Sequence, residues 1–129
     1  MIRINDEMYE NYSVKIEWGS FEVVSSGNRI KGISPFIEFI INDEILIGLE
    51  TVIDKEQFLN MQINKKVNIE RYLTDVTYED DAGWMSIWNK KLNCAITKIS
   101  DVKFKIEFNI EAKEMERLDI IIDDNVVLL

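Results

Sequence analysis

The sequence contains no histidine and a single cysteine, and these two shortages exclude more chemistry than any motif supports. Without histidine the chain has no Ser-His-Asp or Cys-His nucleophile, no imidazole acid–base catalyst and no ligand set of the common zinc sites. One thiol excludes an internal disulfide, a multi-cysteine metal site and an iron–sulfur cluster. Cys94 alternates with apolar neighbours, so we expect a buried side chain. We therefore assign no catalytic residue, no metal site and no cofactor.

Glycine and proline are scarce, and long apolar runs are missing. The five glycines are scattered, so the chain has neither a phosphate-binding loop nor a dinucleotide-binding fingerprint. The longest apolar runs are far shorter than the roughly 20 residues that span a bilayer. The first residues, Met1–Asn5, lack the apolar core of a signal peptide. We therefore expect a cytoplasmic protein that does not enter a membrane.

The charge balance is acidic, with 24 Asp and Glu residues against 15 Lys and Arg residues and a net charge of −9. A negative surface repels phosphate backbones, so we expect no nucleic-acid partner, whereas a basic protein would be attracted. The length of 129 residues, 47% of them hydrophobic, fits one domain spanning residues 1–129. Frequent Ile, Lys and Asn, which have AT-rich codons, favour a bacterial or phage source.

Residues 102–111 show the clearest structural signal. Polar residues alternate there with the apolar residues Val102, Phe104, Ile106, Phe108 and Ile110. Successive side chains of a strand point to opposite faces, whereas a helix would scatter these residues around its circumference. The segment is predicted to be a strand, with Phe104, Ile106 and Phe108 in the core.

Residues 12–18 alternate in the same way, but the apolar positions change parity after Gly19-Ser20. Gly-Ser could form a two-residue hairpin loop, which would place Glu17 opposite Glu22. Alternatively, Gly19 could mark a β-bulge within one long bent strand. We favour the hairpin.

A central hairpin is predicted from residues 36–41 and 45–49, with Asn42-Asp43 in the turn because both residues tolerate positive φ. Both segments are apolar on both faces except at Glu38, which indicates a hairpin covered on both sides, as in a sandwich or a filled barrel. Glu38 is either a carboxyl in a cleft or a structural residue that pairs with a Lys or Arg across the strands. We favour the structural role.

One helix is predicted over about residues 55–61. The sequence from Asp54 to Gln57 has the form of a capping box with Asp54 as N-cap, and Ile53 and Phe58 occupy the positions of a hydrophobic staple. The helix should be short because β-like residues follow it.

The remainder of the chain suggests hairpins. A polar loop at 79–83 and a turn at 89–91 separate strands, 112–117 is a charged connection, and 118–122 and 126–129 are predicted to form a last hairpin around 123–125. The expected fold is mainly β: a single-domain antiparallel sandwich or barrel of about nine strands with one short helix.

The densest acidic group lies directly before two tryptophans. Neither this group nor residues 123–125 has the spacing of a calcium-binding loop, so both are expected to be solvated turns. Tryptophans four residues apart share a strand face, which favours packing in the core. At a rim, by contrast, an aromatic beside acids would form a contact patch for a basic partner. The candidate partner-binding residues are therefore Glu79, Asp80, Asp81, Trp84 and Trp88.

These features favour a non-catalytic protein-interaction domain of a bacterial or phage cytosolic protein, and an inhibitor or immunity-type protein fits the size, acidity and β content. One alternative is an oligomeric phage structural or accessory protein joined through strand edges or apolar patches. Another is a β-barrel that binds a small apolar ligand. The sequence leaves the oligomeric state open, and it leaves room for an enzyme with paired carboxylates, of which Glu38 would be one.

Overall fold

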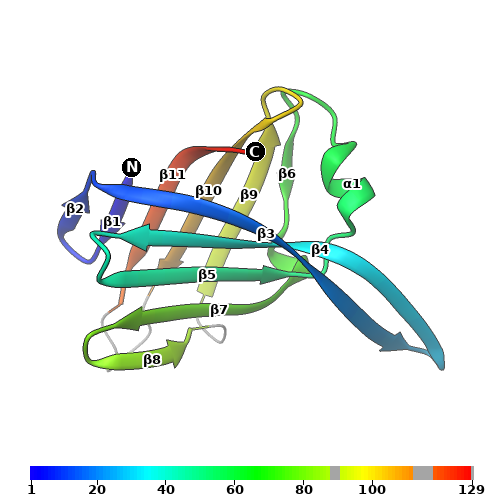
Figure 1. Cartoon of the computed structure of the whole chain (residues 1–129), viewed down its shortest axis with the longest axis horizontal. Coiled ribbons are helices and arrows are strands. Elements are labelled where there is room, and N and C mark those ends of the chain that lie inside the picture. The colour runs from blue at the N-terminus through cyan, green and yellow to red at the C-terminus, as the bar shows by residue number, and fades with distance from the viewer. Residues whose placement is uncertain (88–90, 112–117, 129) are drawn as a thin grey trace.

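The computed structural model describes residues 1–87, 91–111 and 118–128, which form two antiparallel β-sheets packed face to face (Figure 1). The six-stranded sheet contains, in spatial order, β2 (Glu7–Tyr9), β1 (Ile2–Ile4), β11 (Ile120–Val127), β10 (Lys103–Glu111), β9 (Lys91–Lys98) and β6 (Lys66–Asn68). The five-stranded sheet contains β3 (Tyr12–Ser25), β4 (Asn28–Ile41), β5 (Ile45–Thr51), β7 (Leu73–Asp80) and β8 (Gly83–Ser86). The predicted mainly β antiparallel fold is confirmed, and of the two expected architectures, sandwich or barrel, the structure has the sandwich. The described residues hold more strands than the predicted nine because β1, β2 and β6 have three residues each, too few to show an alternation.

The core lies between the two sheets, whose strands cross one another in the view of Figure 1. As predicted, the alternation in β10 places Phe104, Ile106 and Phe108 in the interior. Phe58 enters from the helix, stacks on Phe104 with ring centroids 4.5 Å apart, and meets Trp18 edge-on at 5.7 Å. The space between the sheets is thus filled by close-packed side chains.

The helix α1 (Lys55–Leu59) begins where the sequence predicts. Asp54 has an extended backbone, and its side chain accepts a hydrogen bond from the Glu56 N–H at 3.2 Å. Ile53 and Phe58 are both buried, as the staple requires. The helix ends two residues earlier than expected, at Leu59, whose carbonyl oxygen binds the ammonium group of Lys98.

Replacing Asp54 with alanine should lower the free energy of unfolding by about 0.5–2 kcal/mol, because an N–H of the first helical turn loses its acceptor. Asparagine is an equally good N-cap, so Asp54→Asn is the control and should stay within a few tenths of a kcal/mol of the wild type. Denaturant unfolding measures both variants. An equal loss in both would show that the carboxylate charge, not the cap, is what matters.

The predicted hairpin at Gly19-Ser20 is wrong, and so is the pairing of Glu17 with Glu22. β3 runs through both residues without a register shift, Glu17 lies opposite Phe36, and the turn is Ser26-Gly27, with φ of 53° and 80°. The positive φ values at both positions match the tight turn that fits the twist of a hairpin. The apolar parity changes because the end of the β3–β4 hairpin leaves the sandwich and projects beyond it (Figure 1), so its faces no longer follow the core.

The central hairpin is confirmed, with positive φ at Asn42 and Asp43, but the expectation that it is covered on both sides is wrong. Phe36, Ile40 and Leu46 point away from the core and are half-buried. In Figure 1 no element of the described chain lies in front of the paired part of β4 and β5. Neighbouring side chains cover part of this face instead. The ring of Phe36 lies so close over Gly48 that an added Cβ would come within 2.9 Å of it.

The predicted last hairpin is also wrong, because residues 120–127 form the single strand β11. Asp123 and Asp124 therefore lie within a strand and do not form a turn. Asp123 points to solvent and lies 3.8 Å from the ammonium of Lys105, while Asp124 accepts a hydrogen bond from the hydroxyl of Tyr12. Because adjacent side chains of a strand point to opposite faces, Asp123 lies on the solvent-exposed face, and Asp124 lies on the other face, where it is half-buried. The predicted connection at 112–117 and most of the predicted turn at 89–91 lie outside the described residues.

Candidate interaction surfaces

Four of the five predicted partner-binding residues lie on one hairpin at the edge of the five-stranded sheet. Glu79 and Asp80 belong to β7, and Trp84 belongs to β8 directly opposite Glu79. The predicted polar loop at 79–83 is shorter than expected: only Asp81-Ala82 forms the turn, and the Asp80 carboxylate accepts the Ala82 N–H at 2.9 Å. This local bond, typical of turns with Asp, explains the tight connection. The fifth predicted residue, Trp88, lies outside the described residues.

Trp84 is 64% exposed, so the expectation that it packs in the core is wrong. The pairing of β8 with β7 decides its orientation. Met85 lies opposite the inward-facing Tyr78, and Trp84, opposite Glu79, therefore belongs to the outer face. The inward position expected for a large apolar residue is taken by Ile87, which follows β8, is buried and donates its N–H to the carbonyl of Val76.

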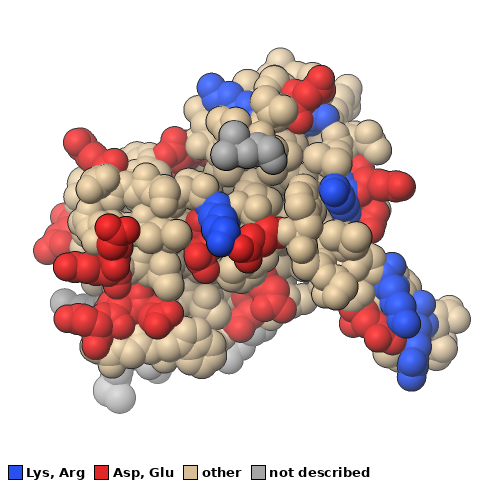
Figure 2. Space-filling view, in the orientation of Figure 1, with Lys and Arg blue, Asp and Glu red and all other residues tan. Residues whose placement is uncertain are grey.

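Acidic residues gather at the end of the sandwich that contains this hairpin. Figure 2 shows the concentration of red side chains there on one face, far from the projecting β3–β4 hairpin. The acids come from turns and strand ends that are distant in sequence: Glu7, Glu10, Asp43, Glu44, Asp80 and Asp81. We call this group, together with Glu79 and Trp84, the acidic end.

Two tyrosines near the acidic end have raised pKa values. Burial raises the pKa of Tyr78 to about 12, and the hydrogen bond and charge of Asp80 act in the same direction. Tyr9 has a raised pKa because its hydroxyl donates to Glu7 at 2.8 Å, with a smaller contribution from Glu44. Both phenols therefore stay neutral near neutral pH and act as hydrogen-bond donors.

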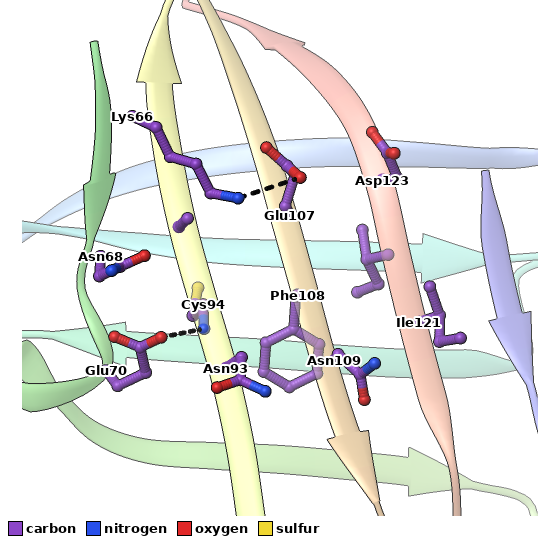
Figure 3. Close-up of a pocket in the computed structure, with 12 residues that line it drawn as sticks. Lys66, Asn68, Glu70, Asn93, Cys94, Glu107, Phe108, Asn109, Ile121 and Asp123 are labelled. Carbon is purple, nitrogen blue, oxygen red and sulfur yellow. Dashed lines mark hydrogen bonds and ion pairs between the residues drawn. The ribbon is translucent and has the colours of Figure 1, made fainter.

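A second candidate surface is a polar hollow of about 430 Å³ on the outer face of the six-stranded sheet (Figure 3). Lys66 and Glu107 form an ion pair across it at 3.6 Å, and the Glu70 carboxylate accepts the Cys94 N–H at 3.0 Å. Asn68, Asn93, Asn109 and Asp123 also belong to the polar lining. The sequence did not reveal this hollow, because its residues come together only through strand pairing.

The thiol of Cys94, which belongs to a strand of this hollow, is not in its reactive form at neutral pH. Burial, with a smaller contribution from Glu70, raises the pKa of Cys94 to about 12, so its thiol is protonated at neutral pH. As predicted, Cys94 is buried. Within residues 1–87, 91–111 and 118–128, no group of three or more carboxylate or thiol side chains is arranged to hold a metal ion. Glu38 lies opposite Lys15 on the neighbouring strand β3, in keeping with the favoured structural role.

The projecting end of the β3–β4 hairpin is a third exposed feature that the sequence did not predict. Val24, Ile30 and Ile33 are largely exposed there, next to the cations Arg29 and Lys31. Arg29 forms an ion pair with Glu22 at 3.6 Å across the hairpin. Phe21 lies over Gly32, where a side chain would collide with its ring, which explains why glycine stands at that position.

Comparison of the chain with protein-family models, with curated protein sequences and with solved structures returns no match. In the described part of the chain, no helix has both the length and the apolar character needed to cross a bilayer.

Proposed function

We propose that this protein is a non-catalytic interaction domain that binds a basic protein partner through its acidic end. The observation that carries the proposal is the exposure of Trp84 beside Glu79 on the edge hairpin β7–β8. A large aromatic that remains exposed in the single chain, next to clustered charges of one sign, is typical of a recognition surface. An inhibitor or immunity-type role in a bacterial or phage cytosol is consistent with this mode of binding.

The acids and the tryptophan would contribute in different ways. Carboxylates at the rim of an interface steer a basic partner and mainly raise the association rate. An aromatic side chain that becomes fully buried on binding mainly slows dissociation. The short edge strand β8 also presents backbone groups, to which a strand of the partner can add.

The test uses the protein captured from lysate by the wild-type chain and compares two kinds of variant. Asp80→Lys with Asp81→Lys should slow association roughly tenfold at low salt and reduce its salt dependence. Trp84→Ala should instead speed dissociation and cost about 2 kcal/mol or more of binding free energy. Surface plasmon resonance at two salt concentrations separates the two effects.

Matched controls lie in β10 and in the β9–β10 turn of the other sheet. Asp101→Lys with Glu111→Lys makes the same change in net charge at exposed positions, and Val102→Ala shortens an exposed apolar side chain. If these controls weaken binding as much as the acidic-end variants, net charge or overall stability governs binding and the proposed surface is wrong.

The alternative of an oligomeric protein is also favoured by one observation, the free edge of β3, which is developed below. The filled interior provides no comparable support for a barrel that binds an apolar ligand.

A further inference from the structure

The five-stranded sheet ends on one side in a long strand with an open edge. β3 has 14 residues and pairs only with β4 among the described strands, whereas the other edge strands, β2, β6 and β8, have three or four residues each. Proteins usually keep edge strands short or cover them, because an open edge offers unpaired N–H and C=O groups to another chain. β3 contains no proline or bulge that would blunt this edge.

The turn of the β3–β4 hairpin determines which backbone groups are free. Residues that flank a two-residue turn form a hydrogen-bonded pair, and here these are Ser25 and Asn28. Odd-numbered residues of β3 therefore bond to β4, as Asn11 does just before the strand, where its carbonyl accepts the Asn42 N–H. Even-numbered residues, including Val14, Ile16 and Trp18, turn their N–H and C=O groups toward the open edge.

We propose that β3 pairs antiparallel with β3 of a second copy of the chain, centred on Ile16, and so joins the two five-stranded sheets into one continuous sheet. In this register Lys15 of each copy lies directly opposite Glu17 of the other copy. The two sites are related by a two-fold axis, as in most dimers of identical chains. This self-pairing goes beyond the proposed recognition by the acidic end, whose Trp84 and β7–β8 hairpin lie at the opposite edge of the same sheet.

Charge complementarity favours this register over the two registers centred one residue away. Lys15 and Glu17 are on the outward face, 58% and 57% exposed, with their charged atoms 2.6 Å apart. A shift of the two-fold centre by one residue would place Lys15 opposite its own copy or Glu17 opposite its own copy, and directly opposed like charges are destabilising. A lone charge on an edge strand discourages pairing with arbitrary strands, so the Lys15–Glu17 match also provides specificity.

The inward face fits the same register. Ile16 would meet Ile16 of the second copy, and Val14 would meet its Trp18. All three side chains are only partly buried in the single chain, although they pack against its core. Pairing would remove more of their apolar surface from water while the free backbone groups gain partners.

Charge reversal with rescue tests the proposal directly. The wild type is expected to sediment as a concentration-dependent dimer, and Lys15→Glu or Glu17→Lys should each weaken dimerisation by about tenfold, because each creates two like-charge contacts per dimer. The double variant Lys15→Glu with Glu17→Lys should dimerise like the wild type. An equimolar mixture of the two single variants should also form a heterodimer, because both cross-strand pairs are then complementary.

The two single variants change the net charge in opposite directions, so a general charge effect cannot weaken both. Lys65→Glu, at another exposed position, is the matched control and should leave the dimer unchanged. Circular dichroism verifies that the variants are folded, as expected for solvent-exposed positions. A wild type that stays monomeric up to millimolar concentration overturns the proposal, and so does a dimer that the single reversals do not weaken.

Discussion

Phe104→Ala is expected to lower the free energy of unfolding by about 3–5 kcal/mol, a large share of the stability of a domain of this size. Phe104 is fully buried and lies at the centre of the contact between β10 and α1, where its ring stacks on Phe58. Truncation removes apolar contacts and leaves a cavity between two rigid sheets that can collapse only in part. Denaturant unfolding with a shared m-value measures the loss.

Phe36→Ala is the appropriate control, because Phe36 is the same residue type but lies half-buried on the outer face. It should cost clearly less, since its removal opens space to solvent instead of an enclosed cavity. Similar losses in the two variants would contradict the burial pattern of the sandwich.

Alkaline pH is expected to destabilise the fold strongly, starting near pH 9. Burial raises the pKa of Cys94 from its ordinary value of 9.0 to about 12, and burial with Asp80 raises that of Tyr78 from 10.0 to about 12. In each case the folded state favours the neutral form. The contribution of each group to the free energy of unfolding is therefore fully present below its pKa in the unfolded chain. This contribution decreases as pH rises toward 12, because the group ionises in the unfolded chain before it does so in the folded chain. For Cys94 alone the decrease is on the order of 4 kcal/mol.

Urea unfolding at about pH 8 and about pH 11 measures this decrease in the wild type, Cys94→Ala and Tyr78→Phe. Each variant should lose less stability between the two pH values than the wild type, because it lacks one of the groups that ionise. The change in unfolding free energy between the two pH values is compared, because the loss of packing caused by each substitution is the same at both pH values and cancels. If Cys94→Ala loses as much unfolding free energy between the two pH values as the wild type, the thiol ionises as readily in the folded chain as in the unfolded chain.

The two edges of the five-stranded sheet have separate proposed roles. β8 presents Trp84 and the acidic end to a partner, whereas β3 pairs with a second copy. A dimer formed through β3 would leave Trp84 and the β7–β8 hairpin of both copies free, so the two interactions are compatible. It would also give a partner with two binding sites a gain in avidity.

The sequence by itself determined those elements that depend only on residues close together in the chain. The alternation in β10, the Asn42-Asp43 turn and the Asp54 cap each depend on neighbouring side chains and backbone, so the sequence alone predicted them. The absence of histidine can be read directly from the sequence, and the burial of Cys94 was predicted from its apolar neighbours. The acidic residues 79–81 were predicted to lie in a hairpin and do so, although its turn is shorter than predicted.

Only the tertiary structure decided which face of each strand meets the core. Periodicity shows that two faces differ, but strand pairing determines which of them points inward, and this choice turned Trp84 to solvent and Ile87 to the core. Likewise, Gly19 lies in the middle of β3 because β4 continues to pair with it beyond the sandwich. The acidic end, the polar hollow and the open edge of β3 arise from segments distant in sequence, and pairing and packing of the two sheets bring them together or leave them free.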